Sequence, residues 1–179
     1  MPEIVIIAGP NGAGKTTFAR EYRLARQTRF VFVNADEIAR ELADQGLTQE
    51  QIDFRAARNV LERVGDLADA GAEFMFETTL ATLIYARKIP LWRRLGYSVS
   101  LIYLRLLSVE DSILRVRRRV EAGGHGIPEH KIRRRFEKSM SYFENTYKSI
   151  VDKWYIYNSV EGGFTLTESW DQDESQARN

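Results

Sequence analysis

Residues 4–17, which read IVIIAGPNGAGKTT, decide the fold. Residues 4–9 (IVIIAG) form a continuous apolar run rich in β-branched residues, which is typical of a strand buried on both faces. Residues 9–17 (GPNGAGKTT) match the pattern G-x-x-x-x-G-K-[ST], and a helix is expected from about Lys15 to Arg26. A strand, a glycine-rich loop and a helix in this order form the structural context in which the pattern binds phosphate groups.

Each residue type in this loop suits a nucleotide phosphate chain. Glycines let the backbone wrap closely, so that its N–H groups point at phosphate oxygens, and the helix N-terminus adds positive partial charge. Lys15 is expected to reach the β- and γ-phosphates, and the Thr16 hydroxyl is expected to bind Mg²⁺. The predicted ATP-binding residues of the loop are Gly9, Pro10, Asn11, Gly12, Ala13, Gly14, Lys15, Thr16 and Thr17.

The rest of the chain alternates strand and helix patterns. Further strands are expected at 30–34, 73–78, 98–106 and 154–159, and helices end at about 71, 96, 122 and 151. Thr48 with Gln51, and Ser108 with Asp111, have the spacing of capping boxes, and Pro128 suits the first turn of the last helix. Five strands separated by helices predict an α/β fold of the P-loop NTPase kind. This fold is a three-layer sandwich around a five-stranded, mainly parallel sheet, here with an arginine-rich helical lid at about 115–136.

The length of 179 residues suits one domain. Residues 1–160 are predicted to form the P-loop domain, and 161–179 a short return strand (FTL) followed by a polar tail. The last dozen residues are expected to be frayed.

The composition excludes several classes of protein. The apolar fraction is 44% and the charged fraction 28%, as in soluble globular domains, and the net charge of +1 gives no general basis for binding nucleic acid or a membrane. No apolar run approaches the roughly 18 residues of a membrane span, the N-terminus does not read as a signal peptide, and there are no cysteines. We therefore expect a cytoplasmic protein without disulfides or zinc–thiolate sites.

Missing motifs narrow the kind of P-loop protein. The strings N-K-x-D and D-x-x-G, which a GTPase needs for guanine and for its switch, do not occur, and neither does an LSGGQ-like signature of ABC-type ATPases. An AAA-type or helicase motor would usually need a longer chain. A small-molecule kinase is what these exclusions leave, and such an enzyme needs a base, an acceptor site and a cationic lid.

Carboxylates follow the second and third strands. Asp36, just past the second strand, is positioned to face the γ-phosphate and accept a proton from an acceptor hydroxyl; the alternative is that Asp36 caps the next helix. Glu37 is expected to point to solvent. Glu77 ends a buried run and therefore needs a cation, a metal-bound water or a hydroxyl donor, the alternative being a structural ion pair. Thr78 and Thr79 suit either acceptor binding or capping of the following helix.

The stretch RVRRRVEAGGHGIPEHKIRRRF (115–136) gathers cations on two helices joined by a glycine-rich turn. Arginines on a mobile lid can stabilise the charge that develops during phosphoryl transfer. Helical spacing lets only one or two cations face inward, and the candidates are Arg119, His125, and Arg134 or Arg135. An RNA-binding patch is the alternative, which the even overall charge disfavours.

The segments GPNGAGKTTFA, FVNADEIA, FETTL and RVEAGGHGIPEHKIRRRF, in this order, resemble the zeta-toxin family of small P-loop kinases, and more narrowly its short bacterial branch. The resemblance covers roughly residues 3–160. It implies a five-stranded P-loop kinase fold and transfer of the ATP γ-phosphate, with Mg²⁺, to a hydroxyl of a nucleotide sugar such as UDP-N-acetylglucosamine. It also implies a small helical antitoxin as a partner.

The resemblance assigns roles to individual residues. Asp36 matches the general base of the family, Glu77 and Thr79 match its acceptor-binding segment, and Arg119 matches a phosphate-binding lid arginine. His125 stands where longer members have a second lid arginine, and Ala81 where they have an arginine that contacts the acceptor. Two alternatives therefore stay open: a kinase of another acceptor (a nucleoside, a cofactor or a nucleic-acid end), and an ATP-dependent regulatory binding module.

Overall fold

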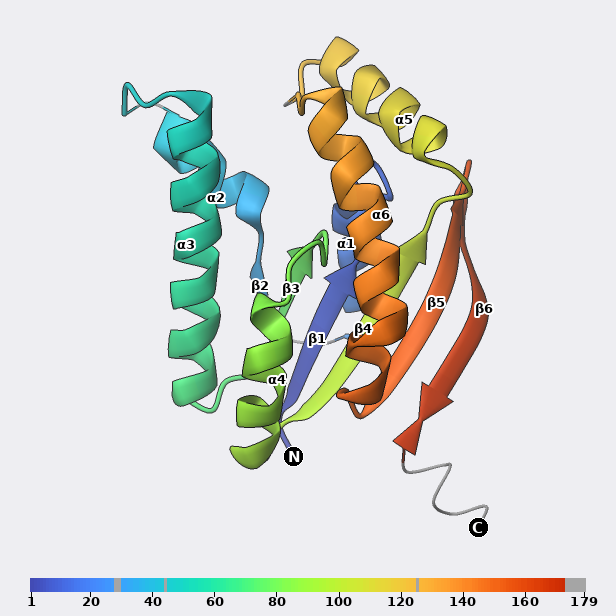
Figure 1. Cartoon of the computed structure of the whole chain (residues 1–179). Coiled ribbons are helices and arrows are strands. Elements are labelled where there is room, and N and C mark those ends of the chain that lie inside the picture. The colour runs from blue at the N-terminus through green and yellow to red at the C-terminus, as the bar shows by residue number, and fades with distance from the viewer. Residues whose placement is uncertain (28–29, 44, 125, 173–179) are drawn as a thin grey trace.

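Strand β1 (Glu3–Ala8) lies in the middle of a six-stranded sheet with the order β2-β3-β1-β4-β5-β6 (Figure 1). The structure is a computed structural model, and it describes residues 1–27, 30–43, 45–124 and 126–172. The first five strands are parallel, and β6 is antiparallel to β5. The remaining strands are β2 (Val31–Val33), β3 (Phe74–Thr78), β4 (Ser98–Arg105), β5 (Lys153–Val160) and β6 (Gly163–Asp171).

Helices cover both faces of the sheet, and this confirms the predicted three-layer α/β fold. Alternate residues of β1 face opposite layers: Ile4 and Ile6 pack with α3, α4 and α6, whereas Val5 and Ile7 pack with α1. The helices are α1 (Lys15–Arg26), α2 (Ala35–Ala43), α3 (Gln49–Asp69), α4 (Ile84–Arg94), α5 (Val109–Glu121) and α6 (Glu129–Asn145), followed by the 3₁₀ turn η1 (Tyr147–Ser149). Among the described residues, no helix has the length and apolar character needed to cross a membrane.

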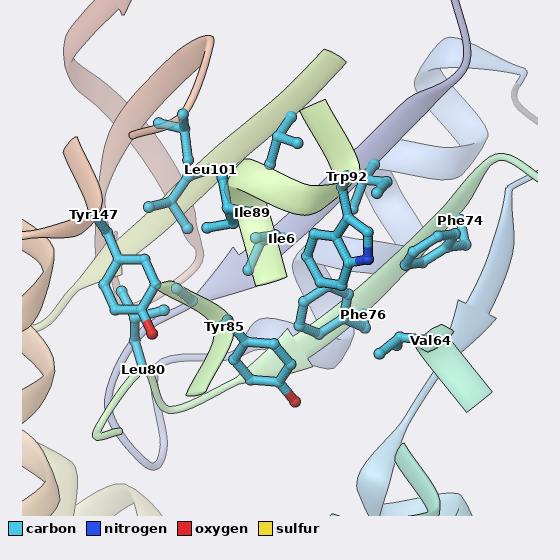
Figure 2. Close-up of a cluster of buried hydrophobic side chains, with 14 of the residues drawn as sticks. Ile6, Val64, Phe74, Phe76, Leu80, Tyr85, Ile89, Trp92, Leu101 and Tyr147 are labelled. Atoms are coloured by element: carbon cyan, nitrogen blue, oxygen red, sulfur yellow. The ribbon is translucent and has the colours of Figure 1, made fainter. Parts of the chain in front are cut away.

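The larger core cluster fixes the segment that follows β3 (Figure 2). The Phe76 ring of β3 lies 4.7 Å from the ring of Tyr85 on α4, measured between centroids. Leu80 is fully buried, although its φ of 57° is unusual for a leucine. The buried Tyr147 donates its hydroxyl to the Thr82 carbonyl at 2.7 Å. The core therefore holds the C-terminal end of β3 in one position.

Several local predictions are confirmed. Thr48 and Gln51 form both bonds of a capping box at the start of α3: the Thr48 N–H donates to Gln51 Oε1 at 2.9 Å, and the Gln51 N–H donates to Thr48 Oγ1 at 3.4 Å. Ser108 caps α5 by accepting the Asp111 N–H at 3.1 Å, but its partner carboxylate bonds the serine hydroxyl rather than the backbone.

Several details predicted for the C-terminal half are wrong. The sheet has six strands, because the return strand β6 is nine residues long rather than the short FTL segment, and residues 168–171 are paired rather than frayed. Pro128 is the N-cap of α6 and not part of its first turn. Helix α6 ends at Asn145, before the expected end, because the backbone of Thr146 (φ −136°, ψ −56°) leaves the helical conformation, and the 3₁₀ turn η1 with the buried Tyr147 follows.

Candidate functional site

The loop between β1 and α1 (residues 9–14) depends on its motif glycines. Gly9 has a φ of 145°, and a Cβ there would lie 2.5 Å from the Leu104 carbonyl oxygen of β4. Gly14 is the N-cap of α1 with a φ of 81°, and a Cβ there would lie 3.1 Å from the ring of Phe164 on β6. The backbone therefore follows the sharp path that exposes the N-terminus of α1.

Helix α5 braces the outside of this loop through residues that the sequence reasoning did not select. The buried Ser112 hydroxyl donates to the Asn11 carbonyl. Arg115 donates to the Gly12 carbonyl at 3.5 Å, and also to the hydroxyl and the carbonyl of Ser159 on β5 at 2.7 and 3.1 Å. Arg115 lies one helical turn before Arg119 on the same helix face, and this spacing could have indicated it.

Lys15 lies folded back onto the loop. Its ammonium donates to the carbonyls of Gly9 and Pro10, both at 3.0 Å. Burial lowers the pKa of Lys15 to about 8, although nearby carboxylates oppose the shift. Because Lys15 is already partly buried, part of the cost of removing water from its ammonium is met before an anion binds.

Charged side chains from four different elements act on the pKa of Lys15. Glu77 of β3 and Asp36 of α2 raise it, whereas Arg119 of α5 and Arg135 of α6 lower it further. The structure therefore brings the carboxylates that follow two strands and two cations of the lid to the same lysine. Asp36, Glu77 and Arg119 are among the site residues predicted from the sequence, which left the choice between Arg134 and Arg135 open.

Thr16 and Glu77 are joined by a hydrogen bond. The Thr16 hydroxyl donates to Glu77 Oε2 at 3.1 Å, while Glu77 Oε1 is buried and has no hydrogen-bond partner among the described residues. Burial raises the pKa of the Glu77 carboxyl, and the charge of Lys15 opposes this. A cation, or water bound to it, would satisfy the buried oxygen, so these two residues fit Mg²⁺.

No group of three or more acidic or histidine side chains that could hold a metal occurs in the part of the chain that the structure describes. Mg²⁺ commonly takes few protein ligands and completes its shell with phosphate oxygens and water. The pair of Thr16 and Glu77 is therefore consistent with a metal that arrives with a nucleotide.

Asp36 lies in the first turn of α2 and is exposed. Its own backbone N–H donates to Asn34 Oδ1 at 2.8 Å, so Asn34, and not Asp36, caps this helix. The alternative structural role for Asp36 is thereby excluded. Glu37 is exposed as well, and its charge raises the pKa of Glu77.

Thr78 and Thr79 end β3 beside Glu77. The Thr78 hydroxyl accepts the Leu80 N–H at 3.0 Å and so fixes the turn. Helix α4 begins at Ile84 with Leu83 as its N-cap, so neither threonine caps it. Thr79 is half-buried at the same edge of the sheet.

The two lid helices contribute unequally. Arg119 and Arg135 are half-buried and their charges lower the pKa of Lys15, whereas Arg134 is exposed. Arg135 is thus the better placed of the two undecided arginines. Burial lowers its pKa, and Asp53 of α3, a residue that the sequence reasoning missed, opposes this. His125 lies outside the described residues.

These features define a P-loop protein with a cationic helical lid. Residues 4–146 match the family model described as an AAA domain, and the chain belongs to this family. The length of the chain argues against an AAA-type motor. The match shows that this length does not exclude membership of the family described as an AAA domain. A protein of Haemophilus influenzae described as uncharacterized is 26% identical over 132 residues, which are 74% of this chain and 91% of that protein.

Solved structures share the fold at low sequence identity. A structure from the PezAT chromosomal toxin–antitoxin system of Streptococcus pneumoniae has a TM-score of 0.70 at 21% identity, over 94% of this chain and 72% of that one. The structure of AvrRxo1-ORF1:AvrRxo1-ORF2 with sulphate ions has a TM-score of 0.73 at 16% identity, over 99% of this chain and 63% of that one. A gluconokinase from Sinorhizobium meliloti has a TM-score of 0.55 at 14% identity, over 89% of this chain and 83% of that one. The fold is that of the P-loop kinases, as the resemblance to zeta toxins implied.

Proposed function

We propose that this protein is a kinase that transfers the γ-phosphate of ATP to a hydroxyl of a small organic acceptor. The observation that carries the proposal is the contact between the start of α1 and the end of β3, where the Thr16 hydroxyl donates to Glu77 Oε2 at 3.1 Å beside Lys15. The charges of Asp36, Arg119 and Arg135 also act on the pKa of Lys15. A binding module needs the phosphate loop alone, whereas phosphoryl transfer needs a carboxylate and cations around the same phosphate.

Each of these residues has its own role in the proposed reaction. Lys15 leaves the Gly9 and Pro10 carbonyls for the β- and γ-phosphate oxygens, and the backbone N–H groups of the loop hold the phosphate chain. The Asp36 carboxylate accepts the proton of the acceptor hydroxyl. The acceptor oxygen bonds to the γ-phosphorus as the bond from that phosphorus to the bridging oxygen breaks, and ADP leaves with the electron pair. Arg119 and Arg135 stabilise the charge on the transferring group.

Thr16 and Glu77 would hold Mg²⁺ when it is bound. The ion supplies positive charge that neutralises the phosphates. The hydrogen bond from the Thr16 hydroxyl to Glu77 Oε2, at 3.1 Å, places these two groups side by side.

For the acceptor we propose a nucleotide sugar, with UDP-N-acetylglucosamine first. The support is the resemblance of the segments that contain Asp36, Glu77 and Thr79 to the zeta-toxin family, together with the common fold. Thr79 and Glu77 lie at the strand end where an acceptor would approach Asp36. The resemblance implies a small helical antitoxin as a candidate partner, and the similar structure from a toxin–antitoxin system of S. pneumoniae supports an antitoxin in general.

The test is transfer of labelled γ-phosphate from ATP, with Mg²⁺, to a panel of UDP-sugars. Asp36→Asn should lower transfer by about 100-fold or more, because it removes the base, while ATP affinity is kept. Glu41→Gln is the matched control, since it removes an exposed carboxylate of the same helix and should leave the rate unchanged. Transfer by Asp36→Asn at the wild-type rate would contradict the proposed base. Label in inorganic phosphate alone would contradict the proposed acceptor class.

A further inference from the structure

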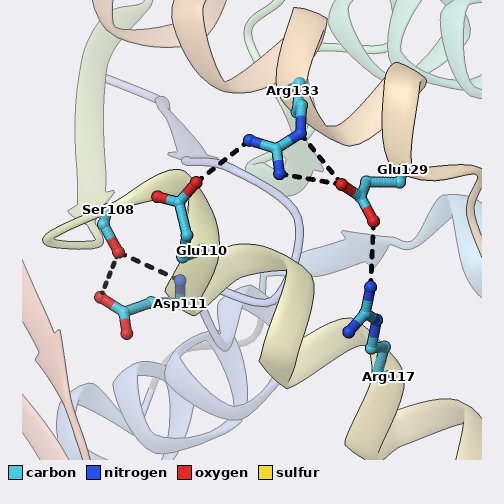
Figure 3. Close-up of polar contacts among 6 residues, drawn as sticks. All are labelled: Ser108, Glu110, Asp111, Arg117, Glu129 and Arg133. Atoms are coloured by element: carbon cyan, nitrogen blue, oxygen red, sulfur yellow. Dashed lines mark hydrogen bonds and ion pairs between the residues drawn. The ribbon is translucent and has the colours of Figure 1, made fainter.

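Four charged side chains form a continuous chain of hydrogen bonds across the lid, on α5 and α6 (Figure 3). Arg133 of α6 donates from Nε and Nη2 to Glu129 Oε1 at 3.0 and 2.8 Å, and from Nη1 to Glu110 Oε1 of α5 at 3.1 Å. Arg117 of α5 donates to the other oxygen, Glu129 Oε2, at 3.0 Å. The chain Glu110–Arg133–Glu129–Arg117, here called the lid clasp, therefore crosses between the two helices twice.

Helix geometry places the lid clasp opposite the arginines of the site. Glu110 and Arg117 are seven residues apart, so they share one face of α5, and Arg119, two residues further on, lies about 200° around the helix. Glu129 and Arg133 likewise share one face of α6, and Arg135 lies about 200° away from Arg133. Each helix therefore has two clasp residues on one side and a site arginine on the other.

The apolar contact between α5 and α6 is small and partly open. The small cluster of Ile113, Val116 and Ile132 joins α5 to α6. Beside it an open pocket of about 300 Å³ is lined by Val120, Ile127 and the clasp residues Arg117 and Glu129, among others. The ion pairs of the lid clasp therefore join the two helices at a place where the apolar contact between them is open to solvent.

We propose that the lid clasp is a positioning element, which holds α5 and α6 at the spacing where Arg119 and Arg135 both face Lys15. The inference rests on the proposed kinase function. Arg133 is the key positioning residue, because it bonds carboxylates of both helices through three nitrogen–oxygen contacts. Isolated exposed ion pairs contribute little, whereas a network built around an arginine that bonds two carboxylates can fix geometry.

The first measurement is the distance between the lid helices in the protein without nucleotide. Because the chain has no cysteine, spin labels can be attached through Leu114→Cys on α5 and Glu137→Cys on α6, both exposed positions. Arg133→Gln should broaden the distance distribution. Arg58→Gln, which breaks an exposed ion pair with Glu62 on α3 away from the lid, should leave it unchanged. An unchanged distribution in Arg133→Gln would overturn the proposal.

The second measurement is affinity for ADP with aluminium fluoride, which mimics the transferring phosphoryl group. Arg133→Gln should weaken this affinity roughly fivefold and leave affinity for ADP alone unchanged, because the lid arginines act on the transferring group. Arg133→Lys should recover part of the loss, since one ammonium can replace some of the contacts. Equal weakening for both ligands would indicate damage to the fold and overturn the positioning role. If the wild type itself does not prefer ADP with aluminium fluoride to ADP, the proposed function fails, while the spin-label distances still decide whether the clasp sets the helix spacing.

Discussion

The pKa of Lys15 makes the stability of the nucleotide-free protein depend on pH in a way that can be measured. Burial lowers this pKa from 10.5 to about 8 in the folded state. The folded protein therefore holds the charged ammonium at a cost of about 3 kcal/mol below pH 8, and this cost disappears as the pH rises to 10.5. Between these values the unfolded chain binds more protons, so the free energy of unfolding increases with pH.

From pH 7 to pH 9, Lys15 should raise the free energy of unfolding by about 1.3 kcal/mol. This window lies below the range in which tyrosines titrate, and burial raises the pKa of the core tyrosine Tyr103 further, to about 12. The assay is urea unfolding of the wild type and of Lys15→Met at both pH values, without nucleotide. The free energy of unfolding of the wild type minus that of Lys15→Met should increase by about 1.3 kcal/mol from pH 7 to pH 9, because the variant lacks the titrating group.

Lys138→Met, which removes an exposed lysine, is the control and should follow the wild type at both pH values. Parallel behaviour of the wild type and Lys15→Met would refute the reasoning. A wild type that becomes less stable relative to Lys15→Met at pH 9 would refute it as well.

Three further variants test single features by urea or thermal unfolding. Gly9→Ala should destabilise the protein by about 3 kcal/mol or more, because its Cβ would meet the Leu104 carbonyl at 2.5 Å; a loss under about 1 kcal/mol would contradict this. Ser112→Ala should cost about 1–3 kcal/mol, since the Asn11 carbonyl loses a buried donor, and Ser112→Thr should cost less if it keeps that bond. Thr48→Ala should cost about 1 kcal/mol and Thr48→Ser almost nothing, and equal losses would exclude the capping box as the cause.

Sequence predicted best where neighbouring residues decide the structure. The run at 4–9 would give a strand that is apolar on both faces, and β1 is accordingly buried and lies between two other strands of the sheet. The capping box of Thr48 and Gln51 forms as expected because its partners lie within one helical turn. The phosphate loop was predictable for the same reason, because its apolar strand, its glycines and its helix start are neighbours in the sequence.

Features set by distant contacts were not predictable. Residues 166–171 (LTESWD) have no strong strand pattern, and β6 forms because β5 offers an edge where Trp170 pairs with Trp154. Which arginine of α6 faces Lys15 depends on the rotation of the helix, and this is set by the packing of Ile132 against α5. Arg115 and Ser112 brace the loop from a helix that begins almost a hundred residues later, so only the assembled fold reveals that contact.

The central claim is that the γ-phosphate leaves ATP for an organic hydroxyl and that Asp36 is needed for this. Phosphorus NMR of ATP and Mg²⁺ with a small-molecule cell extract tests the claim without assuming an acceptor. The account predicts a new phosphomonoester signal that grows as ADP forms with the wild type, and no such signal with Asp36→Asn. ATP consumption that yields only ADP and inorganic phosphate, or an equal phosphomonoester signal from both proteins, would contradict it.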